Sequence, residues 1–399
     1  MRTPWRTIGI LAITQIISWG SIYYAFSIVA PSIARDLALR SELVYGAFSW
    51  SLLVAGLTST PIGILLDRLG GQRIMAAGSL VCGSGLLWLS YCTGLASYYG
   101  AFTLLGLAMA LTLYEAAFAT INRKFDEGAR QAISTLTLFA GFASTIFWPL
   151  TLYLSNTLGW RGAYFWFGMA QLLVCLPLHL FLGPDDSLQR RATGSTTRSL
   201  TLDEALRLAS FWKLAMAFAA NMFTFSALSV HLIPLLTTFG HPLTFAVFVA
   251  ALIGPMQVVG RIGERTVARN MLPQTIGMAT FAALPAALAI LLISGTQAWA
   301  VAGFCILYGL SNGILTIVRG TIPQALYGRE NYGAISGAMA GPSLLSKAAG
   351  PLVAAAILRS GSTWLLLLVL LIVSVTSLLF YLAAIAKTVP VSAQVVEHS

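Results

Sequence analysis

Long apolar segments alternate with short polar links along almost the whole of the 399-residue chain. Most of these segments are close to the roughly 20 residues that an α-helix needs to cross the ~30 Å hydrocarbon core of a bilayer. The pattern therefore predicts an all-α membrane protein. Its twelve expected transmembrane helices cover residues 8–33, 43–66, 74–93, 97–121, 131–155, 162–182, 211–238, 243–267, 273–294, 297–320, 332–358 and 363–386.

One polar link is much longer than the others and falls in the middle of the chain. It begins with Gly183 and Pro184, carries three arginines in a Ser/Thr/Gly-rich stretch, and ends in a short amphipathic segment before Phe211. The predicted domains are an N-terminal six-helix bundle over 1–182, a cytoplasmic linker over 183–210 and a C-terminal six-helix bundle over 211–399.

The composition supports a membrane protein and argues against two other classes. Hydrophobic residues make up 57% of the chain and charged residues 9%, whereas charged residues are roughly a quarter of an ordinary soluble domain. The net charge of +10 does not indicate a nucleic-acid partner, because no basic run lies in a polar segment interleaved with aromatic residues. The chain has no phosphate-binding loop, nucleophile motif or metal-ligand spacing, so we expect no enzyme activity, no cofactor and no metal.

The distribution of Lys and Arg predicts the orientation in the membrane. Sixteen of the 23 lie in tails and links on the side of the N-terminus, and four lie on the opposite side. Because cytoplasmic links carry the excess of basic residues, we expect a multi-pass protein of the cytoplasmic (inner) membrane with both termini inside. The first apolar segment follows a short basic start, but it is too long for a signal peptide and lacks a clear cleavage site.

The two halves contain matching sequence steps. Ala132-Ile133-Ser134 and Pro149-Leu150 of the fifth segment recur 202 residues later as Ala334-Ile335-Ser336 and Pro351-Leu352 of the eleventh. A similar offset places Glu115 of the fourth segment beside the position of Arg319 in the tenth. Duplicated halves around a site near the bilayer midplane are typical of secondary transporters, so we expect two pseudo-symmetric bundles.

The link after the second segment carries a family signature. Gly63, Asp67, Arg68, Gly70 and Arg73 follow the pattern G-x-x-x-D-[RK]-x-G-x-[RK]-[RK], with small variation. Here the chain resembles the major facilitator superfamily, which implies twelve helices in two bundles. The resemblance further implies that these residues close the inner side when the cavity opens outward.

Two further features resemble the oxalate/formate and monocarboxylate branch of that family. They are the step Gly260-Arg261-Ile262 in the eighth segment and Lys347 near the middle of the eleventh. In that branch a base in each of these helices binds the substrate carboxylate, so the resemblance makes Arg261 and Lys347 candidate anion ligands. The fifth segment lacks the G-x-x-x-G-P run of antiporters and the fourth lacks their usual arginine.

Four charged residues lie inside segments that are otherwise apolar: Glu115, Arg261, Arg319 and Lys347. A charge at membrane depth is costly and usually lines a water-filled path. Lys347 lies about 22 Å along its helix, close to mid-membrane. Its charge is balanced by a substrate carboxylate or by a fixed acidic partner, or else the residue lies at the lipid edge. Arg261 is either a bidentate carboxylate ligand or a structural base at the inner boundary.

Glu115 is the only acid that the pattern places well inside a segment. It can exchange a coupled proton, pair with Arg319 as a gate, or serve structure alone. The polar and aromatic residues of the first, seventh and tenth segments are candidates for lining the cavity, although packing and interface anchoring also explain them. These candidates are Trp19, Tyr23, Asn221, Tyr308 and Asn312.

These observations predict a secondary active transporter that moves a small, monocarboxylate-like organic anion by alternating access, with proton coupling or exchange. The expected partners are a carboxylate substrate, a proton and the lipid bilayer, and the expected state is a monomer. The alternative is a proton-driven efflux antiporter for hydrophobic or cationic compounds. A non-transporting sensor of the same fold is a third hypothesis.

Overall fold

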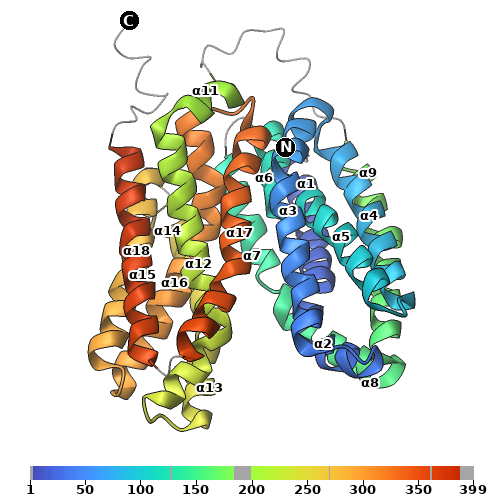
Figure 1. Cartoon of the computed structure of the whole chain (residues 1–399). Helices are drawn as coiled ribbons and strands as arrows, with labels where there is room; N and C mark the ends of the chain where they lie inside the picture. The colour runs from blue at the N-terminus through green and yellow to red at the C-terminus, as the bar shows by residue number, and fades with distance from the viewer. Residues whose placement is uncertain (1–2, 126–127, 184–198, 269, 360–361, 387–399) are drawn as a thin grey trace, which may run out of the picture. The chain divides into compact units, whose positions relative to one another are not determined.

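The computed structural model describes residues 3–125, 128–183, 199–268, 270–359 and 362–386. Every regular element within these ranges is a helix. The all-α prediction is therefore confirmed for the described residues (Figure 1). The expected linker lies largely outside them, but its last part forms the short helix α11 (Leu202–Arg207), opened by a capping box between Thr201 and Glu204.

Up to α11, the described ranges contain ten α-helices and two π-helices, several of them joined end to end. They are α1 (Thr3–Ser18), η1 (Trp19–Tyr24), α2 (Ala25–Asp36), α3 (Ser41–Leu69), α4 (Gly71–Tyr91), α5 (Leu95–Thr112), α6 (Tyr114–Lys124), α7 (Ala129–Ala140), α8 (Ala143–Ala170), η2 (Gln171–Cys175), α9 (Leu176–Leu180) and α11 (Leu202–Arg207). They are followed by α12 (Ala209–Thr238), α13 (Leu243–Ala251), α14 (Ile253–Thr266), α15 (Pro273–Ser294), α16 (Ala298–Tyr327), α17 (Tyr332–Arg359) and α18 (Thr363–Ile385).

Eleven helical stretches of the described chain are long and apolar enough to cross a bilayer. One of them, Ala129–Leu180, has 52 residues, which is far more than the roughly 20 that one crossing needs. It contains the non-helical Gly159, whose φ is +72°, between the fifth and sixth predicted segments. The stretch thus covers two of the twelve predicted segments.

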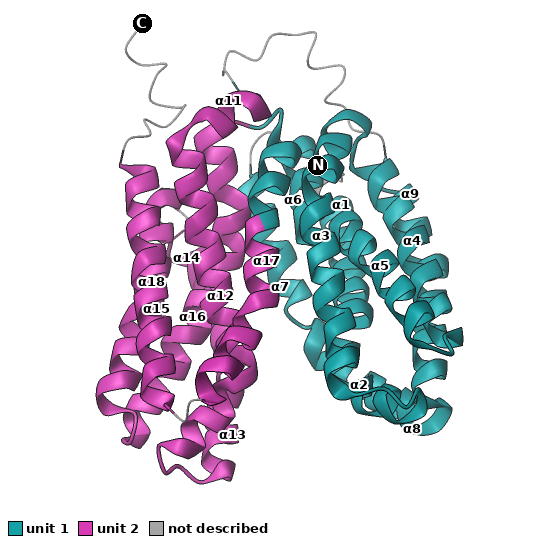
Figure 2. Ribbon diagram, in the orientation of Figure 1, with its two compact units in different colours: residues 1–199, 329–341 teal, residues 200–328, 342–399 magenta. Residues whose placement is uncertain are grey.

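The chain forms two compact units (Figure 2). Unit 1 comprises residues 1–199 and 329–341, and unit 2 comprises residues 200–328 and 342–399. The first ten residues of α17 therefore belong to unit 1, and the rest of this helix belongs to unit 2.

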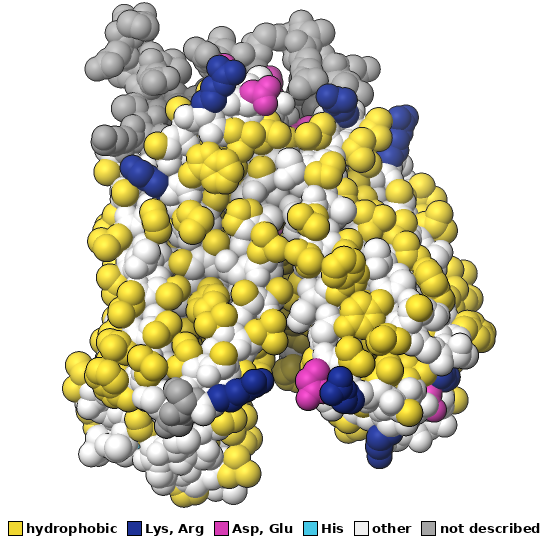
Figure 3. All heavy atoms as spheres, viewed as in Figure 1, with side chains coloured by type: hydrophobic (Ala, Val, Ile, Leu, Met, Phe, Trp, Pro, Cys, Tyr) yellow, Lys and Arg dark blue, Asp and Glu magenta, His cyan; other side chains and the backbone are white. Residues whose placement is uncertain are grey.

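The surface of each unit suits a lipid environment. In Figure 3 the visible Lys and Arg side chains lie toward the ends of the helices, and apolar side chains cover the middle of each unit. Large apolar side chains such as Leu57, Phe248 and Ile293 are exposed on the outside of their helices. Extensive exposed apolar surface marks contact with a membrane or another protein, and together with the helix lengths it shows a multi-pass membrane protein.

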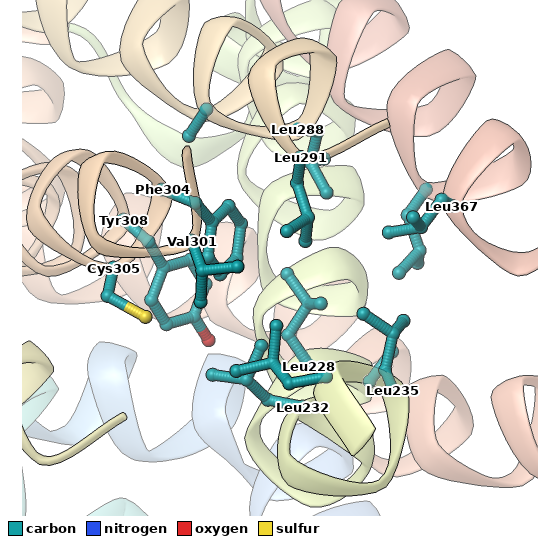
Figure 4. Close-up of a cluster of buried hydrophobic side chains, with 14 of the residues drawn as sticks. Leu228, Leu232, Leu235, Leu288, Leu291, Val301, Phe304, Cys305, Tyr308 and Leu367 are labelled. Carbon is teal, nitrogen blue, oxygen red and sulfur yellow. The ribbon is translucent and has the colours of Figure 1, made fainter. Parts of the chain in front are cut away.

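Unit 2 is held together by a core of aliphatic and aromatic side chains. Leucines of α12, α15 and α18 pack against Val301, Phe304 and Cys305 of α16 (Figure 4). Tyr308 belongs to the same cluster. This core fixes α12 against α16, and both helices carry candidate site residues.

In unit 1, three side chains complete the end of the sixth predicted segment. Arg6, Gln72 and Lys124 donate hydrogen bonds to carbonyl groups between Leu180 and Gly183. The last carbonyl groups of a helix have no partner inside it, and positive charge is favourable at that end. This explains why α1, α4 and α6 carry polar or basic residues at one common end of unit 1. Asp67, whose carbonyl accepts a hydrogen bond from Arg123 of α6, lies at the same end, which we call the Asp67 end.

Candidate functional site

The three bases predicted inside the membrane all belong to unit 2. Arg261 lies in α14, Arg319 in α16 and Lys347 in the unit 2 part of α17. Arg261 is only 6% exposed, and Glu264, three residues later in the same helix, is 3% exposed. Residues at i and i+3 lie on one face of a helix, so α14 buries a base and an acid side by side.

Glu264 changes the sequence-based picture of the membrane acids. The pattern placed Glu115 alone well inside a segment, and Glu264 falls near the end of the predicted segment 243–267. In the structure α14 continues to Thr266 and buries Glu264. The structural interpretation of Arg261, which the sequence left open, therefore has a specific candidate partner.

The close approach of α16 explains why a glycine, Gly260, precedes Arg261. A Cβ atom at Gly260 would lie 2.8 Å from the carbonyl oxygen of Leu310 in α16. A Cβ at Gly309 would lie 2.6 Å from the Met256 side chain of α14. Helices whose contact surface is made of small residues bring their backbones close together in membranes, and here this packing holds α14 firmly beside α16.

Lys347 is half-buried, and it lies 15 positions after the first residue of α17. Its carbonyl oxygen accepts a hydrogen bond of 2.6 Å from the Ser226 hydroxyl of α12. The backbone that carries this base is thus tied to a neighbouring helix of the same unit.

The candidates on α16 divide into two groups. Asn312 and Arg319 are half-buried and share a face by their i, i+7 spacing. Arg319 also contacts the sulfur of Met222 on α12, at 3.9 Å. Tyr308 differs, because it is only 2% exposed and its hydroxyl donates to the Phe225 carbonyl.

Tyr308 and Asn221 are both buried in the interior of unit 2. The Tyr308 ring also stacks on the Phe225 ring, with centroids 4.6 Å apart. Such placement favours the packing role that the sequence left open for these two residues, and it leaves Asn312 as the half-buried candidate of the pair on α16.

Glu115 lies in unit 1, where the fourth predicted segment is interrupted. Leu113 has non-helical dihedral angles and separates α5 from α6. Glu115 is half-buried in the first turn of α6, where the helix dipole favours a negative charge. The buried Gln15 donates a hydrogen bond of 2.5 Å to the carbonyl of Thr112, which immediately precedes the interruption.

Aromatic side chains surround this interruption, and we call Trp19, Tyr23, Tyr24, Phe48 and Tyr114 the aromatic cluster. Trp19 lies in the π-helix η1, with ring centroids 5.4 Å from Tyr23 and 5.0 Å from Tyr114. The rings of Trp19 and Tyr23 thus pack edge to face. All five members are half-buried, and π-helical turns are frequent at functional sites.

The Asp67 end of unit 1 contains the signature residues of the link between α3 and α4. The buried Asp67 carboxylate accepts hydrogen bonds from the backbone N–H groups of Gly333 (3.0 Å) and Ala334 (2.7 Å), in the first turn of α17. Gly70 has φ +85°, a backbone conformation that favours glycine. Arg68 and Arg73 are exposed.

Small residues let α3 and the start of α17 pack closely within unit 1. The Ser59 hydroxyl donates to the Gly337 carbonyl at 2.7 Å. One turn away, a Cβ at Gly63 would overlap the carbonyl oxygen of Gly333. The glycine of the signature is therefore explained by the close approach of two backbones.

We expect Gly63→Ala to lower the thermal stability of the purified protein. The added methyl group meets backbone atoms, which cannot move aside, and overpacking of this kind costs about 1–3 kcal/mol. Gly9→Ala is the matched control, because a Cβ at Gly9 meets nothing within 4 Å. Melting temperatures in detergent measure the difference, and equal values for both variants would contradict the close contact.

The sequence model of the Major Facilitator Superfamily matches residues 11–351 of the chain. The chain belongs to the major facilitator superfamily. The family resemblance of the link between α3 and α4 is thus confirmed over most of the sequence, and a transporter rather than an enzyme is indicated.

Known relatives of this superfamily member include monocarboxylate transporters. Monocarboxylate transporter 4 of Gallus gallus is 23% identical over 333 residues, which cover 79% of this chain and 69% of that protein. Monocarboxylate transporter 13 of Rattus norvegicus is 30% identical over 155 residues, which cover 38% of this chain and 32% of that protein. These relatives agree with the branch indicated by Arg261 and Lys347.

Solved structures of the superfamily share the fold. The Escherichia coli fucose:proton symporter FucP aligns with a TM-score of 0.75 at 14% identity, covering 96% of this chain and 99% of that chain. The human organic anion transporter MFSD10 aligns with a TM-score of 0.70 at 15% identity, covering 96% and 100%. At these identities the likeness establishes the fold alone.

Proposed function

We propose that this protein is a secondary active transporter that carries a small organic anion, in the first instance a monocarboxylate, across the cytoplasmic membrane by alternating access. The placement of Lys347 carries the proposal. It is a half-buried base about 22 Å along α17, and a base at membrane depth usually serves a substrate or ion path. The monocarboxylate transporters among the relatives support the same substrate class.

Arg261 is the second proposed anion ligand, and Arg319 is a third candidate. A guanidinium group grips a carboxylate in two places. Arg261 shares a face of α14 with the buried Glu264. Each hydrogen bond that its guanidinium group donates to Glu264 is one that it cannot donate to a substrate carboxylate. Lys347 therefore has the stronger case as a substrate ligand.

We further propose that the aromatic cluster contacts the apolar body of the substrate. Half-buried aromatic rings offer large apolar surfaces while their hydroxyl and indole groups stay available for hydrogen bonds. The cluster lies next to the interruption at Leu113. Packing within unit 1 remains the alternative for these residues.

A second candidate function is efflux of hydrophobic or cationic compounds by proton antiport. One observation favours it: Glu115 directly follows Tyr114 of the aromatic cluster. A half-buried carboxylate can bind an organic cation, and aromatic faces attract cations as well. In this case Glu115 binds the cation or proton and the three bases are structural.

Transport by purified protein in liposomes separates the two functions. We expect saturable counterflow of labelled lactate, oxalate or a related acid, and loss of this counterflow when Arg261 or Lys347 is replaced by alanine. Saturable transport of a lipophilic cation that both alanine variants retain would instead establish the efflux function.

Glu115 is the proposed proton-coupling residue, with pairing to Arg319 as a gate as its alternative. We expect Glu115→Gln to abolish the stimulation of uptake by a pH gradient while counterflow exchange persists, because glutamine cannot take up the coupled proton. Uptake into liposomes with and without an imposed gradient measures this. Glu330→Gln is the control, since Glu330 is an exposed acid outside the apolar helices; gradient-driven uptake that survives Glu115→Gln would remove the coupling role.

The arrangement proposed in the membrane follows from the basic residues and the repeat. Two six-helix halves, 1–182 and 211–399, are joined by the cytoplasmic linker 183–210. Both termini lie in the cytoplasm, and the transporter works as a monomer.

A further inference from the structure

Pro351 removes a backbone donor four residues, about one helical turn, after Lys347. In an α-helix the N–H of residue i+4 donates to the carbonyl of residue i, and proline has no N–H to give. Pro351 lies within α17 and is the i+4 residue of Lys347. The carbonyl group of Lys347 therefore loses its usual partner at the position where the proposed anion ligand is attached to the backbone.

Ser226 of α12 supplies the missing donor. Its hydroxyl lies 2.6 Å from the Lys347 carbonyl oxygen, and its side chain is 8% exposed. A buried carbonyl without a donor costs free energy, so this bond favours one arrangement of α17 around Lys347.

Two neighbouring contacts join the same parts of the two helices. The His231 Nε2 atom lies 3.1 Å from the Pro351 carbonyl, to which it donates. A Cβ atom at Gly350 would lie 2.6 Å from the Phe223 carbonyl oxygen and 3.1 Å from the Ala227 nitrogen. The backbones of α12 and α17 are thus nearly in contact on either side of Ser226.

The far side of α12 is fixed as well. The Phe225 carbonyl accepts from Tyr308 at 3.0 Å, and the two rings stack. Since Phe225 directly precedes Ser226, the core of unit 2 holds the segment of α12 that donates to α17.

We propose that Ser226 is a positioning residue for Lys347: its hydroxyl replaces the N–H that Pro351 lacks, and it thereby sets the position from which the Lys347 ammonium meets a substrate anion. This inference rests on the proposed function only for its effect on transport. The effect on Lys347 itself is independent of any substrate. A site must hold its binding groups in place through supporting hydrogen bonds, and Ser226 provides such a bond here.

The test compares Ser226→Ala with a matched serine of the same helix. Ser229 lies one turn further along α12, is exposed, and donates only to the Ser226 carbonyl of its own helix. We expect Ser226→Ala to raise the KM for labelled monocarboxylate counterflow by about tenfold, with maximal rate nearly unchanged, since a bonded polar group is lost beside the ligand. Ser229→Ala should leave both constants unchanged.

A second substitution provides a rescue that general destabilisation cannot imitate. Pro351→Ala restores a backbone N–H four residues after Lys347 and makes the Ser226 hydroxyl dispensable. The double variant Ser226→Ala with Pro351→Ala should therefore recover most of the wild-type KM. Additive losses in the double variant would overturn the proposal.

Lysine NMR reads the positioning without any transport. The chain has four lysines, Lys124, Lys213, Lys347 and Lys387, and reductive ¹³C-methylation labels each while keeping its charge. We expect Ser226→Ala, but not Ser229→Ala, to shift or broaden the Lys347 signal, which Lys347→Arg assigns, and the double variant to restore it. An unchanged Lys347 signal in Ser226→Ala would overturn the inference, whereas a shifted signal combined with unimpaired transport by Lys347→Ala would refute only the proposed function.

Discussion

Replacing Lys347 by alanine should abolish measurable monocarboxylate counterflow. Removing one partner of a desolvated charge pair costs about 2–5 kcal/mol, and 2.7 kcal/mol corresponds to about a hundredfold loss of affinity. Lys347→Arg keeps the charge but changes its shape and reach, so we expect partial activity, reduced by about tenfold. Counterflow of labelled substrate into liposomes measures both variants.

The matched control for Lys347 is Lys213→Ala. Lys213 is also a half-buried lysine of unit 2, but its ammonium lies near the end of α18, 3.5 Å from the Ala383 carbonyl. We expect this variant to transport normally. If Lys347→Ala instead transported monocarboxylates with the wild-type KM, the anion-binding role of Lys347 would be lost, and a structural partner for this base would become the better explanation.

The course of the chain through the membrane could be predicted because it depends on local composition. Each apolar segment of about 20 residues has one stable option in a bilayer, a helix that satisfies its own backbone groups. The turn at Gly70 was equally local, since its positive φ requires glycine. These features need no knowledge of the neighbouring helices.

The interruptions inside the helices could not be predicted in this way. The break at Leu113 and the π-helical turn from Trp19 to Tyr24 lie in continuous apolar runs. The hydropathy of such a run does not distinguish an α-helix from a π-helix or from an interrupted helix. What accompanies the break is a tertiary contact, the hydrogen bond from Gln15 to Thr112. Partners that distant in sequence leave no periodic signal.

The direction of polar side chains was also beyond the sequence. Tyr308 lies in a helix that is apolar on most sides, so no amphipathic pattern separates a cavity face from a core face. The structure buries it in the core of unit 2, whereas Asn312, four residues later, is half-buried. Glu264 lies among other charged residues near the end of its predicted segment, and nothing in that pattern indicates that the structure buries it.

One signal in the sequence did contain more than the pattern alone indicated. Pro351 is part of the repeat with Pro149, and its distance of four residues from Lys347 also predicts a carbonyl group that lacks its usual donor. Only the structure identifies Ser226 as that donor. The sequence thus predicts that the Lys347 carbonyl needs a donor, and the packing of α12 against α17 determines which residue donates.

The second large effect is expected at Asp67, whose replacement by alanine should lower both stability and turnover. The N–H groups of Gly333 and Ala334 would lose their charged acceptor. Each buried donor left without a partner costs about 1–3 kcal/mol, and the start of α17 also loses a favourable charge at its positive end. We expect a clear drop in melting temperature.

The effect on transport follows if α17 leaves and rejoins α3 in each cycle, as the proposed alternating access requires. A loss of about 3 kcal/mol from one of two states shifts their ratio by roughly a hundredfold. Turnover of counterflow should then fall at least tenfold, while the KM changes little because Asp67 is not one of the proposed anion ligands. Glu42→Ala removes an exposed acid from the first turn of α3 and is the control. Wild-type turnover and melting temperature in Asp67→Ala would show that the carboxylate neither caps α17 nor controls the Asp67 end.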